Sequence, residues 1–215
     1  MSQLLNRLSI NNLIISGVAI LVCLTLHEFA HGLVAYWLGD NTAKSQGRLS
    51  LNPFAHLDPI GTIMIVFFGF GYAKPVPVNM YNFKNPKAGM ALVAAAGPLM
   101  NILITAVCFF LYGINLIKTP GSFAGEIVFH VAIISASLAV FNLIPIPPLD
   151  GSKVLFSFLP NKAYAHSING TQIGGIILML LIFSGLLTPI LNIGVQFVTN
   201  HLQPCIGFGQ FIASL

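Results

Sequence analysis

Leu13–Leu38 reads LIISGVAILVCLTLHEFAHGLVAYWL, a stretch that holds one acidic residue, Glu28, and neither lysine nor arginine. A helix needs about 20 mostly apolar residues to cross a bilayer, so the stretch predicts a transmembrane helix. The whole chain has the same character, because 56% of its 215 residues are hydrophobic and only 7% are charged. A soluble domain carries charges on roughly a quarter of its residues. The composition therefore excludes a soluble globule and makes lipid the solvent for much of the chain.

Three further apolar stretches reach the length of a span, at approximately residues 88–117, 126–144 and 173–199. A fifth, residues 59–73, is short for a span and rich in glycine and phenylalanine, which fits a re-entrant segment or a short span. The sequence contains no stretch of soluble-domain composition and no visible repeat. We therefore expect an all-α polytopic membrane protein with four to five transmembrane helices, folded as a single domain over residues 1–215.

The connection after the first span contains two stretches with the pattern of extended chain. Gly47–Asn52 (GRLSLN) and Lys74–Asn79 (KPVPVN) are short and are punctuated by proline and polar residues. They favour extended segments or a small hairpin near the membrane surface.

The basic residues lie between the apolar stretches and indicate the orientation of the chain. Cytoplasmic loops carry the excess of lysine and arginine, and the split is seven against two if residues 59–73 do not cross, or six against three if they do. We favour four spans, an outside N-terminus and a cytoplasmic connection over residues 39–87. A nucleic-acid-binding protein clusters such residues with aromatic residues on one face, so we expect a lipid bilayer and no nucleic acid as partner. The seven residues are Lys44, Arg48, Lys74, Lys84, Lys87, Lys153 and Lys162, against Arg7 and Lys118.

The sequence HEFAH inside the first span has the pattern of a zinc site. His27 and His31 are four residues apart and lie on one helical face, so both imidazoles can reach one ion. Glu28 is turned about 100° further round the helix, where a carboxylate can take a proton from a metal-activated water. Because such residues are costly inside a membrane, they need a partner or a wet cavity. A polar contact between helices, or a proton relay, is the alternative interpretation.

A catalytic zinc site needs a third protein ligand, and Asp150 is the strongest candidate. It follows the third span in NLIPIPPLDG (142–151), where prolines break the helix and bring an acidic group to irregular backbone. Such backbone is tolerated at membrane depth only where it is buried or lines a cavity. With four spans, His31 and Asp150 approach the same side of the membrane. The alternative is a helix stop with a surface aspartate.

These motifs together resemble the site-2 protease family of intramembrane zinc metalloproteases, in its small prokaryotic branch without a PDZ domain. The likeness covers about residues 20–160. It rests on the order of five motifs: HEFAH (27–31), NPFAHLDPIG (52–61), AKPVPVN (73–79), AGPLMN (96–101) and NLIPIPPLDG (142–151). Met80 departs from the branch, which often has proline there.

The resemblance implies a function and a set of site residues. It implies zinc as the cofactor, His27, His31 and Asp150 as its ligands, and Glu28 as the general base. It also implies substrates that are transmembrane helices of other proteins, cleaved in regulated intramembrane proteolysis. We expect an integral protein of a prokaryotic cell membrane, with the active site towards the cytoplasm. The oligomeric state cannot be inferred from the sequence.

Three further polar residues have two interpretations each. Asn142 resembles a motif asparagine that donates to the oxyanion or orients substrate, and the alternative is a hydrogen bond at the helix end. Asn101 could act similarly, or it could satisfy backbone groups freed by Pro98. His56 either lines the site from the connection or is a surface histidine.

Two other functions remain open at the level of sequence. A transporter or channel could use Glu28, His27 and Asp150 as an ion or proton relay, although transporters usually show internal repeats and more spans. An inactive relative could bind membrane proteins without cleaving them, although all the groups that hydrolysis needs are present.

Overall fold

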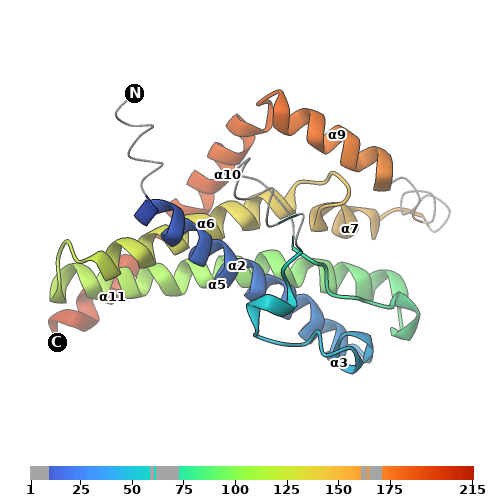
Figure 1. Ribbon diagram of the computed structural model, residues 1–215, viewed down its shortest axis with the longest axis horizontal. Helices are drawn as coiled ribbons and strands as arrows, with labels where there is room; N and C mark the ends of the chain where they lie inside the picture. Colours follow the sequence, from blue (N-terminus) through green and yellow to red (C-terminus); the bar gives the residue numbers. More distant parts are fainter. Residues whose placement is uncertain (1–9, 59–60, 62–72, 161–163, 165–170) are drawn as a thin grey trace. The chain divides into compact units, whose positions relative to one another are not determined.

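The computed structural model describes residues 10–58, 61, 73–160, 164 and 171–215 (Figure 1). Over these residues the regular structure is helical and no strand occurs. Three helices are long and apolar enough to cross a membrane: α2 (Ile10–Trp37), α5 (Pro86–Lys118) and α6 (Phe123–Leu143). The all-α, multi-spanning fold predicted from the sequence is confirmed. The predicted short span or re-entrant segment at 59–73 lies almost wholly outside the described residues.

The last apolar stretch is interrupted rather than continuous. It forms α9 (Thr171–Phe183) and α10 (Leu187–Leu202), and α11 (Pro204–Ser214) follows. The break falls at Gly185, whose φ of +72° lies in the left-handed region that glycine adopts at little cost. Glycine in this conformation ends helices, so the span predicted over 173–199 consists of two helices. The described residues contain three candidate spans, or up to four if this broken pair counts as one.

The helices are divided between two compact units, and each unit is described by itself. The first contains Met1–Cys23, Asn101–Val140 and Thr188–Leu215. The second contains Leu24–Met100 and Phe141–Leu187.

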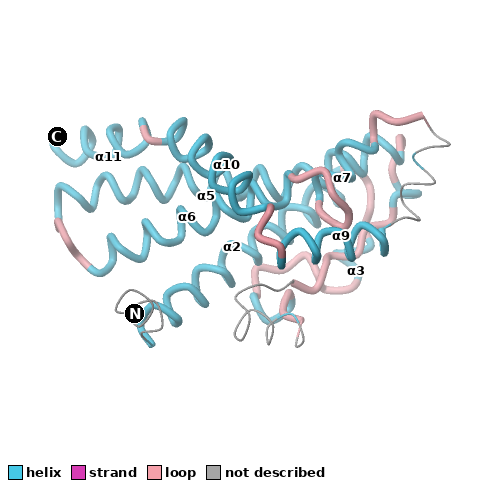
Figure 2. Tube along the Cα trace, turned by 90° about the horizontal axis from the view of Figure 1, so that it is seen from above, coloured by secondary structure: helices cyan, strands magenta, loops and turns pink. Residues whose placement is uncertain are grey.

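The first unit packs its helices through small residues. The Ser135 hydroxyl of α6 donates to the Asn101 carbonyl of α5 at 2.9 Å. Gly209 of α11 approaches α5 so closely that a Cβ there would lie 2.1 Å from the carbonyl oxygen of Phe110 (Figure 2). Lipid tails give no hydrophobic drive between helices, so membrane helices associate through such close backbone contacts and hydrogen bonds.

The second unit contains the connection between α2 and α5 and the turn that follows α6. Its short helices are α3 (Thr42–Ser45), η1 (Pro53–Ala55), η2 (Met80–Asn82) and α7 (Asp150–Phe156). Its apolar core is centred on Ala35, Phe83 and Val93, with partly buried side chains packed against it: Val34, Leu38, Val78, Met80 and Met90.

A segment without helix or strand, Ala73–Asn79, runs through the second unit and is called the strap below. Its last residue, Asn79, has an extended backbone with φ −106° and ψ 102°, and no hairpin pairing occurs among the described residues. Its first residues are fixed by the Lys74 amide, which donates to the His56 carbonyl at 2.9 Å, and by Arg48, which donates to the Lys74 carbonyl at 2.8 Å. These bonds tie the start of the strap to His56 and Arg48.

The carboxylate of Asp40, just after α2, fixes the other end of the strap. Asp40 has no exposed surface. One of its oxygens accepts from the Asn79 amide at 2.7 Å, and the other accepts from the Asn82 side chain at 2.7 Å and from the amide and hydroxyl of Thr42. Burial would raise the pKa of Asp40, but these hydrogen bonds lower it below its ordinary value.

Candidate metal centre

Helix α2 presents two histidines to the inside of the second unit. His27 and His31 are separated by one helical turn and are only 3% and 8% exposed. Their rings are nearly perpendicular, with centroids 4.6 Å apart, and their Nε2 atoms lie 3.0 Å from each other. The i, i+4 spacing therefore brings two imidazole nitrogens to one point.

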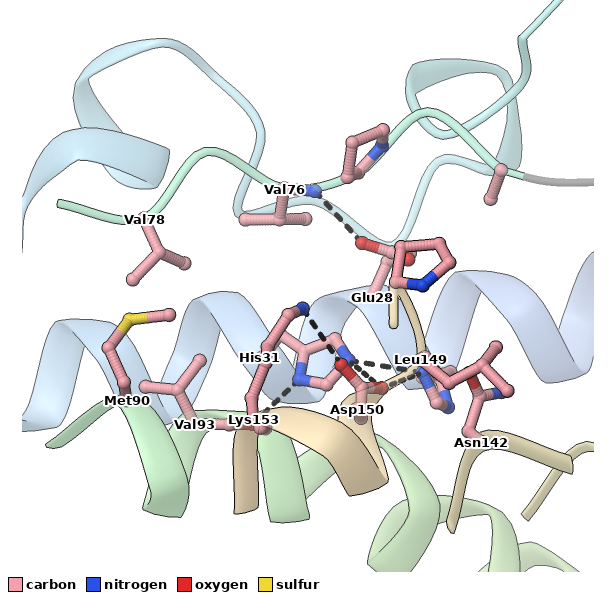
Figure 3. A pocket seen from close by; sticks show the side chains of 15 residues that line it. Glu28, His31, Val76, Val78, Met90, Val93, Asn142, Leu149, Asp150 and Lys153 are labelled. Carbon is pink, nitrogen blue, oxygen red and sulfur yellow. Dashed lines mark hydrogen bonds and ion pairs between the residues drawn. The ribbon is translucent and has the colours of Figure 1, made fainter. Parts of the chain in front are cut away.

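Asp150 brings a carboxylate to the same point from a segment more than one hundred residues away. It is the first residue of α7, it follows the proline-rich turn after α6, and it is 6% exposed. One of its oxygens, Oδ2, lies 3.1 Å from Nε2 of His27 and 3.1 Å from Nε2 of His31. The three atoms form a nearly equilateral triangle, so the Asp150 predicted as a third ligand lies beside both histidines (Figure 3).

A hydrogen bond of the remote ring nitrogen fixes which nitrogen of His31 carries the proton. Nδ1 of His31 lies 2.7 Å from the carbonyl oxygen of Val93, so Nδ1 carries a proton and donates it. In the neutral ring the Nε2 lone pair then points at the Asp150 carboxylate and at His27. A hydrogen bond from the remote ring nitrogen is the usual way to orient a metal-ligating histidine.

A zinc ion fits this donor set. Zinc binds histidine nitrogen and carboxylate oxygen at about 2.0–2.1 Å, which separates tetrahedral ligands by about 3.3 Å. The observed separations of 3.0 to 3.1 Å are close to that value. Two histidine nitrogens and one carboxylate oxygen would fill three of the four tetrahedral positions of a zinc ion. Catalytic zinc sites use the fourth for water or substrate.

The charge of Asp150 also suits a cation. Burial would raise the pKa of this carboxyl, but the imidazoles of His27 and His31 and the ammonium of Lys153 hold it below its ordinary value. Asp150 is therefore ionised at neutral pH and available as an anionic ligand.

Glu28 lies next to the triangle without belonging to it. A carboxylate oxygen of Glu28 lies within 4.8 Å of a ring nitrogen of His27 and of His31. One carboxylate oxygen, Oε2, accepts a hydrogen bond from the Val76 amide of the strap at 2.9 Å. The Glu28 carboxylate is thus held beside the triangle by the strap, with one of its oxygens bonded to the Val76 amide.

The triangle opens on a cavity of about 480 Å³ within the second unit. Figure 3 shows Val78, Met90 and Val93 to one side of His31, and Asn142 and Leu149 on the far side of Asp150. The Asn142 predicted to contact substrate is therefore part of the cavity wall. The lining residues are His27, Glu28, His31, Ala73, Pro75, Val76, Val78, Met90, Val93, Ala94, Asn142, Pro148, Leu149, Asp150 and Lys153.

Two sequence-predicted site residues are not among the described residues that line the cavity. Asn101 belongs to the first unit, is fully buried, and accepts hydroxyl hydrogen bonds from Thr105 and Ser135 on its carbonyl. His56 is buried, so the surface interpretation is wrong, and it is not among the described residues that line the cavity. Its Nε2 donates to the Ser50 carbonyl at 2.8 Å, and its own carbonyl holds the strap.

Gly97 is a site residue that sequence reasoning missed. A Cβ at this position of α5 would lie 2.5 Å from Nε2 of His27 and 2.5 Å from Nε2 of His31. Real Cβ contacts are never that short, so only glycine allows α5 to pass this close to the two imidazoles. A glycine directly before Pro98 in an apolar helix was the available signal.

Comparison with known proteins adds a family and relatives. The model of "Peptidase family M50" matches residues 114–183, which include Asn142 and Asp150. Bacillus subtilis YwhC, provisionally named a zinc metalloprotease, is 38% identical over 187 residues, covering 82% of this chain and 85% of the relative. A similarly named Methanocaldococcus jannaschii protein is 35% identical over 146 residues, which cover 66% of this chain and 69% of the relative. Rip2 of Mycolicibacterium smegmatis, also provisionally named a zinc metalloprotease, is 27% identical over 185 residues, which cover 84% of this chain and 68% of the relative. No solved structure matches significantly.

Proposed function

We propose that this chain, which belongs to peptidase family M50 and is an integral-membrane zinc metalloprotease, cleaves peptide bonds within transmembrane segments of other membrane proteins. The observation that carries the proposal is the triangle of His27, His31 and Asp150 beside Glu28, at the wall of a mostly apolar cavity. We place all four residues in the active site.

His27, His31 and Asp150 are the proposed zinc ligands. Zinc supplies Lewis-acid polarisation of water and of the scissile carbonyl when it is bound. The Val93 carbonyl keeps the His31 lone pair directed at the site. The proposal is supported by the 3.0 to 3.1 Å that separate the three atoms, which the one-turn spacing of the histidines and the start of α7 bring together.

Glu28 is the proposed general base. Its carboxylate takes a proton from the attacking water and returns it to the leaving amine, as general acid–base catalysis requires. The Val76 amide occupies one carboxylate oxygen, so the other is the oxygen that handles the proton. The strap therefore contributes to catalysis by orienting the base.

Asn142 is the proposed contact for the substrate main chain. Its side chain lies on the cavity wall beyond Asp150, where a carboxamide can donate to a substrate carbonyl as negative charge develops. The opposite side of the cavity is apolar, with Val78, Met90 and Val93. This lining suits the apolar side chains that flank a cleavage site in a transmembrane helix.

The proposed setting is a prokaryotic cell membrane, with the site towards the cytoplasm. The excess of basic residues in the connection that carries the strap supports this orientation. Cleavage of signalling proteins in regulated intramembrane proteolysis is the proposed biological use.

One comparison of two proteins tests the proposal. Wild type and Glu28→Gln are purified in detergent, their zinc content is measured, and a panel of transmembrane-helix substrates is incubated with each. We expect one zinc per chain in both proteins and cleavage by wild type alone. Equal cleavage by the two would remove Glu28 as the base. Zinc binding without cleavage of any membrane substrate by wild type would favour an inactive or differently specific relative.

A further inference from the structure

Lys153 makes a contact with Asp150 that the catalytic roles above do not use. Its ammonium lies 3.1 Å from Oδ1 of Asp150, while the other oxygen, Oδ2, faces the two imidazoles. The Lys153 side chain is 46% exposed, whereas that of Asp150 is 8% exposed. The two carboxylate oxygens thus have separate partners. Oδ1 faces the Lys153 ammonium, and Oδ2 faces the Nε2 atoms of His27 and His31.

The turn that carries both residues is tightly packed. Asp150 and Lys153 are three residues apart on α7 and share one face of that helix. Between them, Gly151 packs so tightly that a Cβ would lie 2.2 Å from the Leu143 carbonyl oxygen, and the buried Ser152 hydroxyl donates to the Leu149 carbonyl at 2.6 Å. The backbone therefore keeps the Cα of Lys153 within reach of the carboxylate, and its ammonium lies 3.1 Å from Oδ1.

A carboxylate binds a metal ion through one oxygen or through both, and the difference decides how many coordination positions remain. We propose that Lys153 is a positioning residue that holds Asp150 as a one-oxygen ligand and so keeps the zinc site open for substrate and water. The ammonium occupies Oδ1, so only Oδ2 is left for the ion. This inference rests on the ligand set of the proposed function.

A simple surface ion pair would have different consequences. Pairs between exposed side chains contribute about 0–1 kcal/mol and leave a distant site unchanged. Here one partner is a buried carboxylate that faces two imidazoles, so loss of the cation changes the ligand itself. Partners of metal ligands change metal affinity by about 10–100-fold when they are removed.

The experiment compares Lys153→Gln, Lys153→Met and Lys153→Arg with wild type. Zinc affinity is measured by competition with a chelator, and cobalt(II) is substituted to record the visible absorption bands. The intensity of these bands falls when four-coordinate cobalt gains a ligand. We expect the Gln and Met variants to bind zinc about tenfold or more weakly, with weaker cobalt bands. Lys153→Arg keeps a cation near Oδ1 and should retain most of the affinity and band intensity.

A matched control is Lys84→Gln, which removes the same charge from an exposed position outside the cavity lining. It should change neither measurement. Wild-type affinity and cobalt bands in both Lys153→Gln and Lys153→Met would overturn the inference, as would an equal loss in Lys84→Gln. If wild type itself binds no zinc, the proposed function fails; if only the Lys153 variants match wild type, that function stands and this inference alone fails.

Discussion

Two buried carboxylates in the second unit, Asp40 and Asp150, have opposite surroundings. Both are nearly inaccessible and both have a pKa below the ordinary value. Asp40 is surrounded by neutral donors of the chain, namely two amides, a hydroxyl and a carboxamide. Asp150 instead faces two imidazole nitrogens and one ammonium.

The difference separates a structural carboxylate from one suited to a metal. The hydrogen bonds of Asp40 satisfy both of its oxygens, so it needs nothing from outside the chain. At Asp150, Oδ2 faces the Nε2 atoms of both His27 and His31, and because Nδ1 of His31 donates to Val93, a neutral His31 directs its Nε2 lone pair at that oxygen, an arrangement that suits a cation. The nature of the neighbouring atoms, more than burial, indicates the role.

The largest expected difference is between Asp150→Asn and Asp40→Asn in peptide cleavage. Asp150→Asn removes a proposed zinc ligand, so we expect kcat/KM to fall at least about 100-fold and zinc to be lost on dialysis. Asp40→Asn should retain zinc and most activity, because it lies at the far end of the strap. Cleavage assays with zinc analysis check both. Equal zinc loss in two folded variants would break the comparison.

Bound zinc should stabilise the fold, and this stabilisation should depend on Asp150 but not on Asp40. A ligand present at 100 times its Kd raises the free energy of unfolding by about 2.7 kcal/mol. We expect chelation to lower the thermal midpoint of wild type and of Asp40→Asn, and to have no effect on Asp150→Asn. Thermal unfolding with and without chelator measures this. A chelator effect that persists in Asp150→Asn would show binding elsewhere.

Asp40→Ala should lower stability without lowering zinc affinity per folded chain. It leaves buried donors unsatisfied, which costs about 1–3 kcal/mol. Because the folded-state pKa of Asp40 is lowered, its contribution is complete above the unfolded-state pKa of about 3.9. It is lost as pH falls through the folded-state value. Wild type should therefore lose stability below about pH 4 more steeply than Asp40→Ala does, in unfolding measured against pH.

Gly97→Ala should weaken zinc binding by about tenfold while leaving the Asp40 region intact. The new Cβ would lie 2.5 Å from both imidazoles, so the rings must move, and His31 must leave the position in which its hydrogen bond to the Val93 carbonyl orients it. The control is Gly17→Ala in α2, where no atom lies within 4 Å of the new Cβ. It should retain wild-type zinc affinity. Equal affinities in the two variants would show that α5 does not confine the ligands.

The sequence predicted the local parts of this protein better than the contacts between distant segments. Helix spacing alone placed His27 and His31 together, and the proline-rich turn indicated Asp150. The approach of Gly97 to the imidazoles could not be predicted, because it depends on how α5 packs against α2. The hydrogen bond from Val76 to Glu28 depends similarly on the path of the strap.

Two other features of the folded chain could not be predicted, for local and tertiary reasons. The apolar run at 173–199 looked continuous because hydropathy does not register the left-handed conformation of a single residue, Gly185. Asn101 and His56 looked available because polar residues in apolar surroundings often serve a site. Both are buried in the folded chain, where the Asn101 carbonyl accepts from the Ser135 hydroxyl and His56 donates to the Ser50 carbonyl, contacts that the sequence alone does not show.

The central claim is that His27, His31 and Asp150 hold one zinc ion. Zinc-edge X-ray absorption of the loaded Glu28→Gln variant tests it most directly, since that protein keeps the ligands while turnover is blocked. The account predicts two imidazole ligands with the remaining scatterers being oxygen, at about 2.0–2.1 Å, and no sulfur. A spectrum with fewer than two imidazoles, or with a sulfur shell from cysteine, would contradict it.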